Sequence, residues 1–169
     1  MNRQTQFVYD MVIKDPKINS ILNIGYRLDS DPAIMNYAKE NKKKWYVLEV
    51  YRPNADELIK NKISTYCMDV MDIDKIDKNF DAIIWLHGPE HITWDQFLEI
   101  KDKIEKKSNY LTLYQAPIGV YPQGELGGNP YEKHVTTLYP AMFLELGYNT
   151  EDYEQYGEKT FSAWLIKAK

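Results

Sequence analysis

Residues 80–92, FDAIIWLHGPEHI, decide the fold. The first seven are almost all apolar, and such an unbroken run is typical of a strand in a parallel sheet that is covered on both faces. The strand is expected over residues 80–86, and His87-Gly88-Pro89-Glu90-His91 follows it. Polar residues then gather directly after the strand, where parallel sheets bind their ligands.

Strand-like and helix-like stretches alternate on both sides of this segment. Strands are also expected at residues 18–25, 45–50, 63–68, 109–116, 148–153 and 160–168. Helices are expected at residues 5–14, 34–38, 55–60, 94–106 and 140–146. This order predicts an α/β fold: a doubly wound, mostly parallel, Rossmann-like sheet with a C-terminal antiparallel hairpin. Residues 1–169 are expected to form a single domain.

Capping signals mark where several of the helices begin. The expected caps are Asp31 before Pro32, Asn54 with Glu57, and Thr93 with Gln96. In the helix after Thr93, the side chains expected to face the core are Trp94, Phe97, Leu98 and Ile104. Residues 117–133 hold three prolines and four glycines, so we expect a long loop there, and such loops are usually functional.

The composition excludes several classes of protein. The net charge of −4 argues against a dedicated nucleic-acid binder, which needs a basic surface. No apolar run is long enough to cross a membrane, and the first residues lack the apolar core of a secretion signal. The cytoplasm is therefore the expected location. The single cysteine, Cys67, allows no internal disulfide, and inside a strand we expect it to be buried and inert.

Acidic residues end two successive strands, and a glycine ends the strand before them. These residues are Gly25, Glu49 and Asp69. Glycine lets a backbone approach a ligand, one carboxylate suits the two hydroxyls of a ribose, and the other suits the amine of an adenine. The pattern favours a nucleoside site. The structural alternative is that Glu49 and Asp69 only cap the helices that follow them.

Five segments together resemble one family. The order ILNIG, YVLEV, YCMDV, FDAIIWLHGPEHI and then GNPYEKH (residues 128–134) is similar to class I S-adenosylmethionine-dependent methyltransferases. The resemblance covers roughly residues 18–150. It implies S-adenosylmethionine (SAM) as the cofactor. The cofactor-binding residues that it implies are Asn23, Gly25, Tyr26, Glu49, Val50, Asp69, Val70, Leu86 and His87.

The resemblance also implies what each part of this set contacts. Gly25 and Tyr26 would face the methionine part of SAM and Glu49 its ribose. Asp69 and Val70 would flank the adenine, whereas Leu86 and His87 would lie beside the sulfonium.

The glycine turn departs from the pattern of the family, (D/E)xGxGxG. Asn23 stands at the acid position, and Gly25 is followed by Tyr26 and Arg27 rather than by further glycines. A cation about 4 Å from the sulfonium would repel it by roughly 4 kcal/mol. Arg27 must therefore point away, pair with an acid such as Asp29 or Asp31, or mark a site for another ligand.

Methyl transfer to a small or medium-sized acceptor is the leading hypothesis, with oxygen or nitrogen favoured over carbon as the accepting atom. The candidate general bases are His91 and His134, because histidine titrates near neutrality. The structural alternatives are a backbone hydrogen bond for His91 and a surface position for His134. No metal site is expected, because Gly88-Pro89 breaks the helix that would align His87 with His91.

Two other functions stay open. One is a catalytically inactive methyltransferase-like module for binding or assembly, which the altered glycine turn would suit. The other is a nicotinamide-dependent oxidoreductase, although it needs a GxGxxG turn that this chain lacks. An exposed edge strand in the C-terminal hairpin would permit a homodimer.

Overall fold

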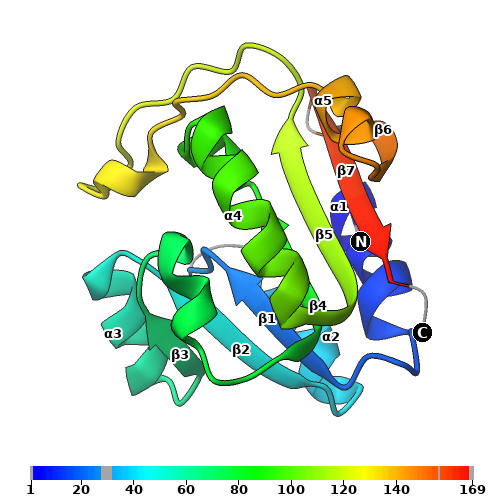
Figure 1. Ribbon diagram of the computed structural model, residues 1–169. Coiled ribbons are helices and arrows are strands. Elements are labelled where there is room, and N and C mark those ends of the chain that lie inside the picture. The colour runs from blue at the N-terminus through cyan, green and yellow to red at the C-terminus, as the bar shows by residue number, and fades with distance from the viewer. Residues whose placement is uncertain (1, 28–31, 156, 168–169) are drawn as a thin grey trace.

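A single seven-stranded sheet forms the centre of the molecule (Figure 1). The computed structural model describes residues 2–27, 32–155 and 157–167. The strands are β1 (Ser20–Ile24), β2 (Lys44–Glu49), β3 (Ser64–Cys67), β4 (Phe80–Leu86), β5 (Ser108–Pro117), β6 (Asn149–Gln155) and β7 (Glu158–Ile166). Their order across the sheet is β3-β2-β1-β4-β5-β7-β6.

The strand directions confirm the expected doubly wound sheet. The first five strands are parallel, with Ile21 opposite Trp45 on one side and Ala82 on the other. β7 runs antiparallel to both β5 and β6, which confirms the C-terminal hairpin. β6 is an edge strand, as the sequence led us to expect.

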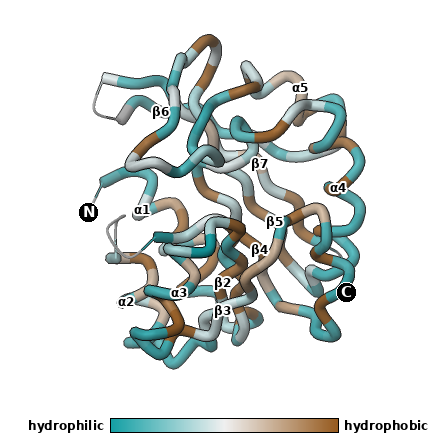
Figure 2. The backbone as a smooth tube through the Cα atoms, turned by 90° about the vertical axis from the view of Figure 1, so that its left-hand side faces the viewer, coloured by the Kyte–Doolittle hydropathy of each residue, from teal (hydrophilic) through white to brown (hydrophobic). Residues whose placement is uncertain are grey.

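Helices cover both faces of the sheet. They are α1 (Arg3–Val8), which continues as a π-helical turn (Tyr9–Ile13), α2 (Ala33–Glu40), α3 (Arg52–Lys60), α4 (Trp94–Lys107) and α5 (Pro140–Glu145). Short 3₁₀ helices lie in the connecting segments. They are η2 (Val70–Lys75), η3 (Pro89–His91) and η4 (Pro130–Glu132). In the hydropathy view the hydrophobic stretches concentrate in the central strands (Figure 2).

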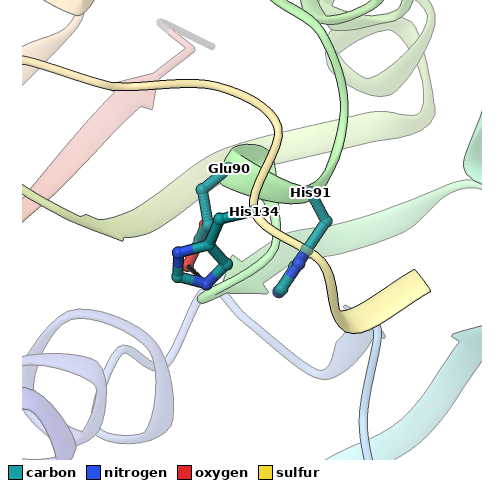
Figure 3. Close-up of side chains that lie close together, drawn as sticks. All are labelled: Glu90, His91 and His134. Atoms are coloured by element: carbon teal, nitrogen blue, oxygen red, sulfur yellow. Dashed lines mark ion pairs between the residues drawn. The ribbon is translucent and has the colours of Figure 1, made fainter. Parts of the chain in front are cut away.

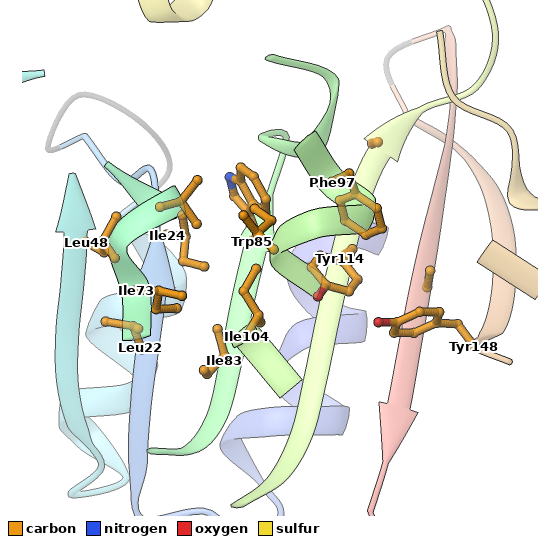
Figure 4. Close-up of a cluster of buried hydrophobic side chains, with 14 of the residues drawn as sticks. Leu22, Ile24, Leu48, Ile73, Ile83, Trp85, Phe97, Ile104, Tyr114 and Tyr148 are labelled. Atoms are coloured by element: carbon orange, nitrogen blue, oxygen red, sulfur yellow. The ribbon is translucent and has the colours of Figure 1, made fainter. Parts of the chain in front are cut away.

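Two hydrophobic clusters hold the layers together, one on each face. Figure 4 shows the first, in which Phe97 and Ile104 of α4 pack toward Trp85 and Tyr114 of the sheet. The second cluster contains residues of the N-terminal segment, α2 and α3, among them Val12, Met35 and Leu58. Within the described residues, no helix combines the length and the apolar character needed to cross a bilayer.

The structure corrects two of the expected helix starts. Tyr51, not Asn54, is the N-cap of α3, because Arg52 and Pro53 already lie in its first turn. Pro32 is the N-cap of α2 and makes no side-chain cap, whereas the expected cap Asp31 lies outside the described residues.

Two expected burials were also wrong. Leu98 is 37% exposed, and Ile100 lies in the core with the expected Phe97 and Ile104, because these three positions share one face of α4. Cys67 is exposed rather than buried, because β3 lies at the edge of the sheet.

The capping box of α4 is confirmed. The Thr93 Oγ1 accepts a hydrogen bond from the Gln96 backbone N–H at 3.2 Å, and the Gln96 side chain accepts one from the Thr93 N–H at 2.9 Å. The two bonds satisfy backbone donors that the first turn of a helix leaves unpaired.

We predict that Thr93→Ala lowers the free energy of unfolding by about 1 kcal/mol, because the backbone N–H of Gln96 loses its acceptor. Thr93→Ser keeps the hydroxyl and is the matched control. Urea denaturation measures both. Equal stabilities of the two variants, within about 0.3 kcal/mol, would show that the cap contributes nothing to α4.

Candidate functional site

A cavity of about 340 Å³ lies at the carboxyl ends of the central parallel strands. This is where the strand order reverses around β1, the usual ligand site of doubly wound sheets. All the cofactor-binding residues expected from the sequence line it: Asn23, Gly25, Tyr26, Glu49, Val50, Asp69, Val70, Leu86 and His87. The structure therefore brings the ends of β1, β2, β3 and β4 to one cavity of ligand size.

Trp85 shapes this cavity, and two glycines make room for its indole. A Cβ atom at Gly88 would lie 1.6 Å from the Trp85 Nε1, so only glycine fits there. A Cβ at Gly25 would lie 3.7 Å from the same atom, and Gly25 also has a φ of +70°, which favours glycine. Tyr26 is largely withdrawn from the ligand space, because its ring packs edge-on against Trp45 and is only 5% exposed.

Glu49 is a buried carboxylate at the end of β2. It is 4% exposed, and its Oε1 accepts a hydrogen bond from the Tyr51 N–H at 2.7 Å. Burial raises the pKa of Glu49 to about 7, with a smaller upward contribution from Glu132 and downward ones from the Tyr51 N–H and Arg27. At neutral pH this group therefore lies near the midpoint of its titration, facing the cavity.

Arg27 has an acidic partner that the sequence analysis did not consider. Its Nη1 lies 3.4 Å from the Oε1 of Glu132, a residue of η4 in the long loop. The two acids expected to neutralise it, Asp29 and Asp31, lie outside the described residues. The pair with Glu132 offsets the positive charge at the rim of the cavity.

Asp69 caps the helix that follows it, which is the structural alternative stated for this residue. Its carboxylate accepts a hydrogen bond from the Met71 N–H at 2.9 Å and so caps η2. The residue is exposed and also lines the cavity, so capping leaves it accessible to a ligand.

The two candidate bases lie side by side, although they are distant in the sequence. His91 belongs to η3, and His134 belongs to the connection between β5 and α5, which includes the long loop. The centroids of their rings lie 4.9 Å apart. Both line a second cavity of about 210 Å³, and His91 and His87 line both cavities. The Nδ1 of His91 makes the backbone contact of its structural alternative, to the Lys133 carbonyl. His134 does not lie at the surface as its alternative proposed: its side chain is only 10% exposed, and its Nδ1 contacts the Tyr121 carbonyl.

Three residues of the loop between β5 and α5 that line the cavity were not predicted from the sequence. Asn129, Tyr131 and Glu132 also line the first cavity. The signal that could have found them is GNPYEKH, which was recognised as part of the family pattern but given no contact. Glu90, buried in η3, was missed as well, although it lies within the decisive stretch.

Comparison of the sequence with protein-family models and with curated proteins gives no match. Among solved structures, a SAM-dependent methyltransferase from Archaeoglobus fulgidus is similar, with a TM-score of 0.70 and 14% identity over 97% of this chain and 93% of that one. The magnesium protoporphyrin IX methyltransferase of Synechocystis PCC 6803 with bound S-adenosylhomocysteine (SAH) gives 0.66 and 8%, over 98% and 80%. A zinc-dependent alcohol dehydrogenase-like protein from Rhodobacter sphaeroides gives 0.58 and 12%, over 72% and 48%. At such identities these comparisons establish the fold, and it is that of class I methyltransferases.

Glu49 gives the stability of the protein a defined pH dependence. Its pKa of about 7 in the fold is above its ordinary value of 4.5, so its contribution to stability is complete below pH 4.5 and is lost as the pH rises through 7. We predict that Glu49→Gln, which keeps an acceptor for the Tyr51 N–H, gains about 2 kcal/mol relative to the wild type between pH 5 and pH 8. Urea denaturation at both pH values measures this gain. A stability difference that does not change with pH would contradict the raised pKa.

Proposed function

We propose that this chain transfers a methyl group from SAM to an oxygen or nitrogen atom of a small or medium-sized acceptor. One observation carries the proposal. In a sheet with the methyltransferase fold, a buried carboxylate, Glu49, faces a ligand-sized cavity at the point where the strand order reverses.

The residues around the cavity suit each part of SAM. Glu49 would accept hydrogen bonds from the ribose hydroxyls, and Asp69 and Val70 would flank the adenine. Gly25, with no side chain, would admit the methionine part, and Leu86 and His87 would lie beside the sulfonium. SAM itself supplies an activated methyl group, so the protein has mainly to align the reactants and exclude water.

The acidic residues that line the cavity favour a positively charged ligand. Arg27 is paired with Glu132, and Glu49 adds a second acid to the same lining. The repulsion expected between Arg27 and a sulfonium is therefore offset by acids from two other segments. This pairing supports SAM binding in spite of the altered glycine turn.

The second cavity is the proposed place for the acceptor. The second cavity adjoins the first, because His87 and His91 line both. It is also lined by Tyr121 and His134, from the connection between β5 and α5. Its volume of about 210 Å³ favours a small acceptor group over a macromolecular surface. His91 and His134 could serve there as general bases or as ligands of a metal ion, and the position of Glu90 favours the second role.

We predict that SAH binds the protein and that its affinity rises about tenfold from pH 6 to pH 8, because the ionised fraction of a carboxyl with a pKa of about 7 rises by that factor. Glu49→Gln should bind SAH more weakly and lose most of this pH dependence. Glu145→Gln, the same change at an exposed position of α5, is the control. Calorimetric titration measures all three proteins.

Two results would count against the proposal. A wild-type affinity that is equal at both pH values would remove Glu49 from ribose binding. No binding of SAH to the folded protein would favour the inactive module.

A further inference from the structure

Three potential metal ligands from two distant segments meet between the two cavities. Glu90 and His91 belong to η3, and His134 belongs to the long loop that folds back over it (Figure 3). One ligand atom from each residue can be chosen so that all three lie within 4.8 Å of one another. The spacing of His87 and His91 in the sequence gave no sign of this group, because His134 is distant in the chain.

The Glu90 carboxylate is the central member. The residue is 1% exposed, and neither side-chain oxygen receives a hydrogen bond from the part of the chain that the structure describes. Its Oε1 lies 3.9 Å from the His134 Nε2 and 3.6 Å from the His87 Nδ1. A carboxylate buried without hydrogen bonds is strongly unfavourable unless a cation compensates for its charge.

In both histidines, Nδ1 is the ring nitrogen that contacts a backbone carbonyl. The Nδ1 of His134 lies 2.7 Å from the Tyr121 carbonyl, and the Nδ1 of His91 lies 3.2 Å from the Lys133 carbonyl. A carbonyl can only accept, so Nδ1 carries the proton in each ring and the Nε2 lone pair is left for a ligand. Histidines that bind metals usually donate their other N–H in this way.

The backbone holds the group in place. The Glu90 carbonyl accepts the N–H groups of Val135 and Thr136 at 2.9 and 3.2 Å, and the His134 N–H donates to the Gln123 carbonyl at 3.0 Å. The Thr136 hydroxyl donates to the Ile92 carbonyl. These bonds tie the loop to η3 on both sides of the three side chains, so the group is largely formed by the fold itself.

We propose that Glu90, His91 and His134 bind one divalent first-row transition-metal ion. Two imidazoles and one carboxylate form a three-ligand set that leaves coordination positions open, as in catalytic zinc sites and non-haem iron sites. Ligand atoms about 2.1 Å from a metal lie about 3.4 Å from one another, so the group has to contract by about 1 Å. Rotations of the two imidazole side chains can provide this movement.

The open coordination positions let the ion bind the methyl acceptor, a role that rests on the proposed function. They face the cavity assigned to the acceptor, which the three ligands line. A divalent ion there holds an acceptor hydroxyl and makes it easier to deprotonate. The proton leaves to solvent, the oxygen bonds to the methyl carbon, and the carbon–sulfur bond breaks with its electron pair going to sulfur. This favours hydroxyl acceptors over amines.

The test is calorimetric titration of the metal-stripped, tag-free protein with Zn²⁺. We expect one ion per chain and a dissociation constant of about 1 µM or below. Glu90→Gln and His134→Ala should each weaken binding by about 100-fold or more. Glu145→Gln, an isosteric acid-to-amide change at an exposed position of α5, should bind like the wild type.

A second measurement does not depend on heats of binding. Saturating Zn²⁺ should raise the Tm of the wild type and of Glu145→Gln by about 5 °C or more, and should leave the Tm of Glu90→Gln unchanged. The circular dichroism of each apo variant checks that it is folded. No saturable binding of Zn²⁺ would overturn the proposal and leave His87 and His134 as the partners of the Glu90 carboxylate. Binding that survives both Glu90→Gln and His134→Ala would also overturn it.

The two proposals can fail separately. Zn²⁺ binding is measured without SAH, and SAH binding is measured in the presence of EDTA. Failure to observe one kind of binding therefore contradicts only the proposal that predicts it.

Discussion

The position of β1, paired with β2 on one side and β4 on the other, determines where everything else in this molecule lies. Because the chain order reverses there, the connections leave the sheet in opposite directions and open a crevice at its carboxyl edge. Gly25, Glu49 and His87 reach that crevice because each lies at the carboxyl end of one of these three strands. Trp85 can fill the floor between them only because Gly88 has no side chain.

The connection between β5 and α5, which includes the long loop, adds residues to the lining of both cavities. Its 3₁₀ helix η4 brings Glu132 to Arg27 at the first cavity, and two residues later His134 reaches Glu90 at the second. One segment thus closes two adjoining cavities, and the Glu90 carbonyl anchors it between them. At the substituted glycine turn, the Tyr26 ring packs against Trp45, and Arg27 is paired with Glu132 of η4.

The sequence could predict the fold and the residues that line the first cavity of the candidate site, for local reasons. The strand at residues 80–86 and the Thr93 capping box were predicted from residues that are neighbours in the chain, and both are confirmed. The strand ends located the cofactor-sized cavity, because parallel strands share one carboxyl edge. The partnership of Arg27 with Glu132 and that of Glu90 with His134 could not be predicted, since no local pattern links residues so far apart. The start of α3 was misplaced because Asn54 is a good cap by type, whereas Pro53 had already fixed the first turn.

The most direct test of the account is a crystal structure of the protein with SAH. The account predicts SAH in the cavity at the ends of β1, β2 and β4, with both ribose hydroxyls within hydrogen-bond distance of the Glu49 carboxylate. The adenine should lie beside Val70 and the sulfur beside Leu86. SAH bound elsewhere, or an occupied cavity in which Glu49 does not contact the ribose, would contradict the account.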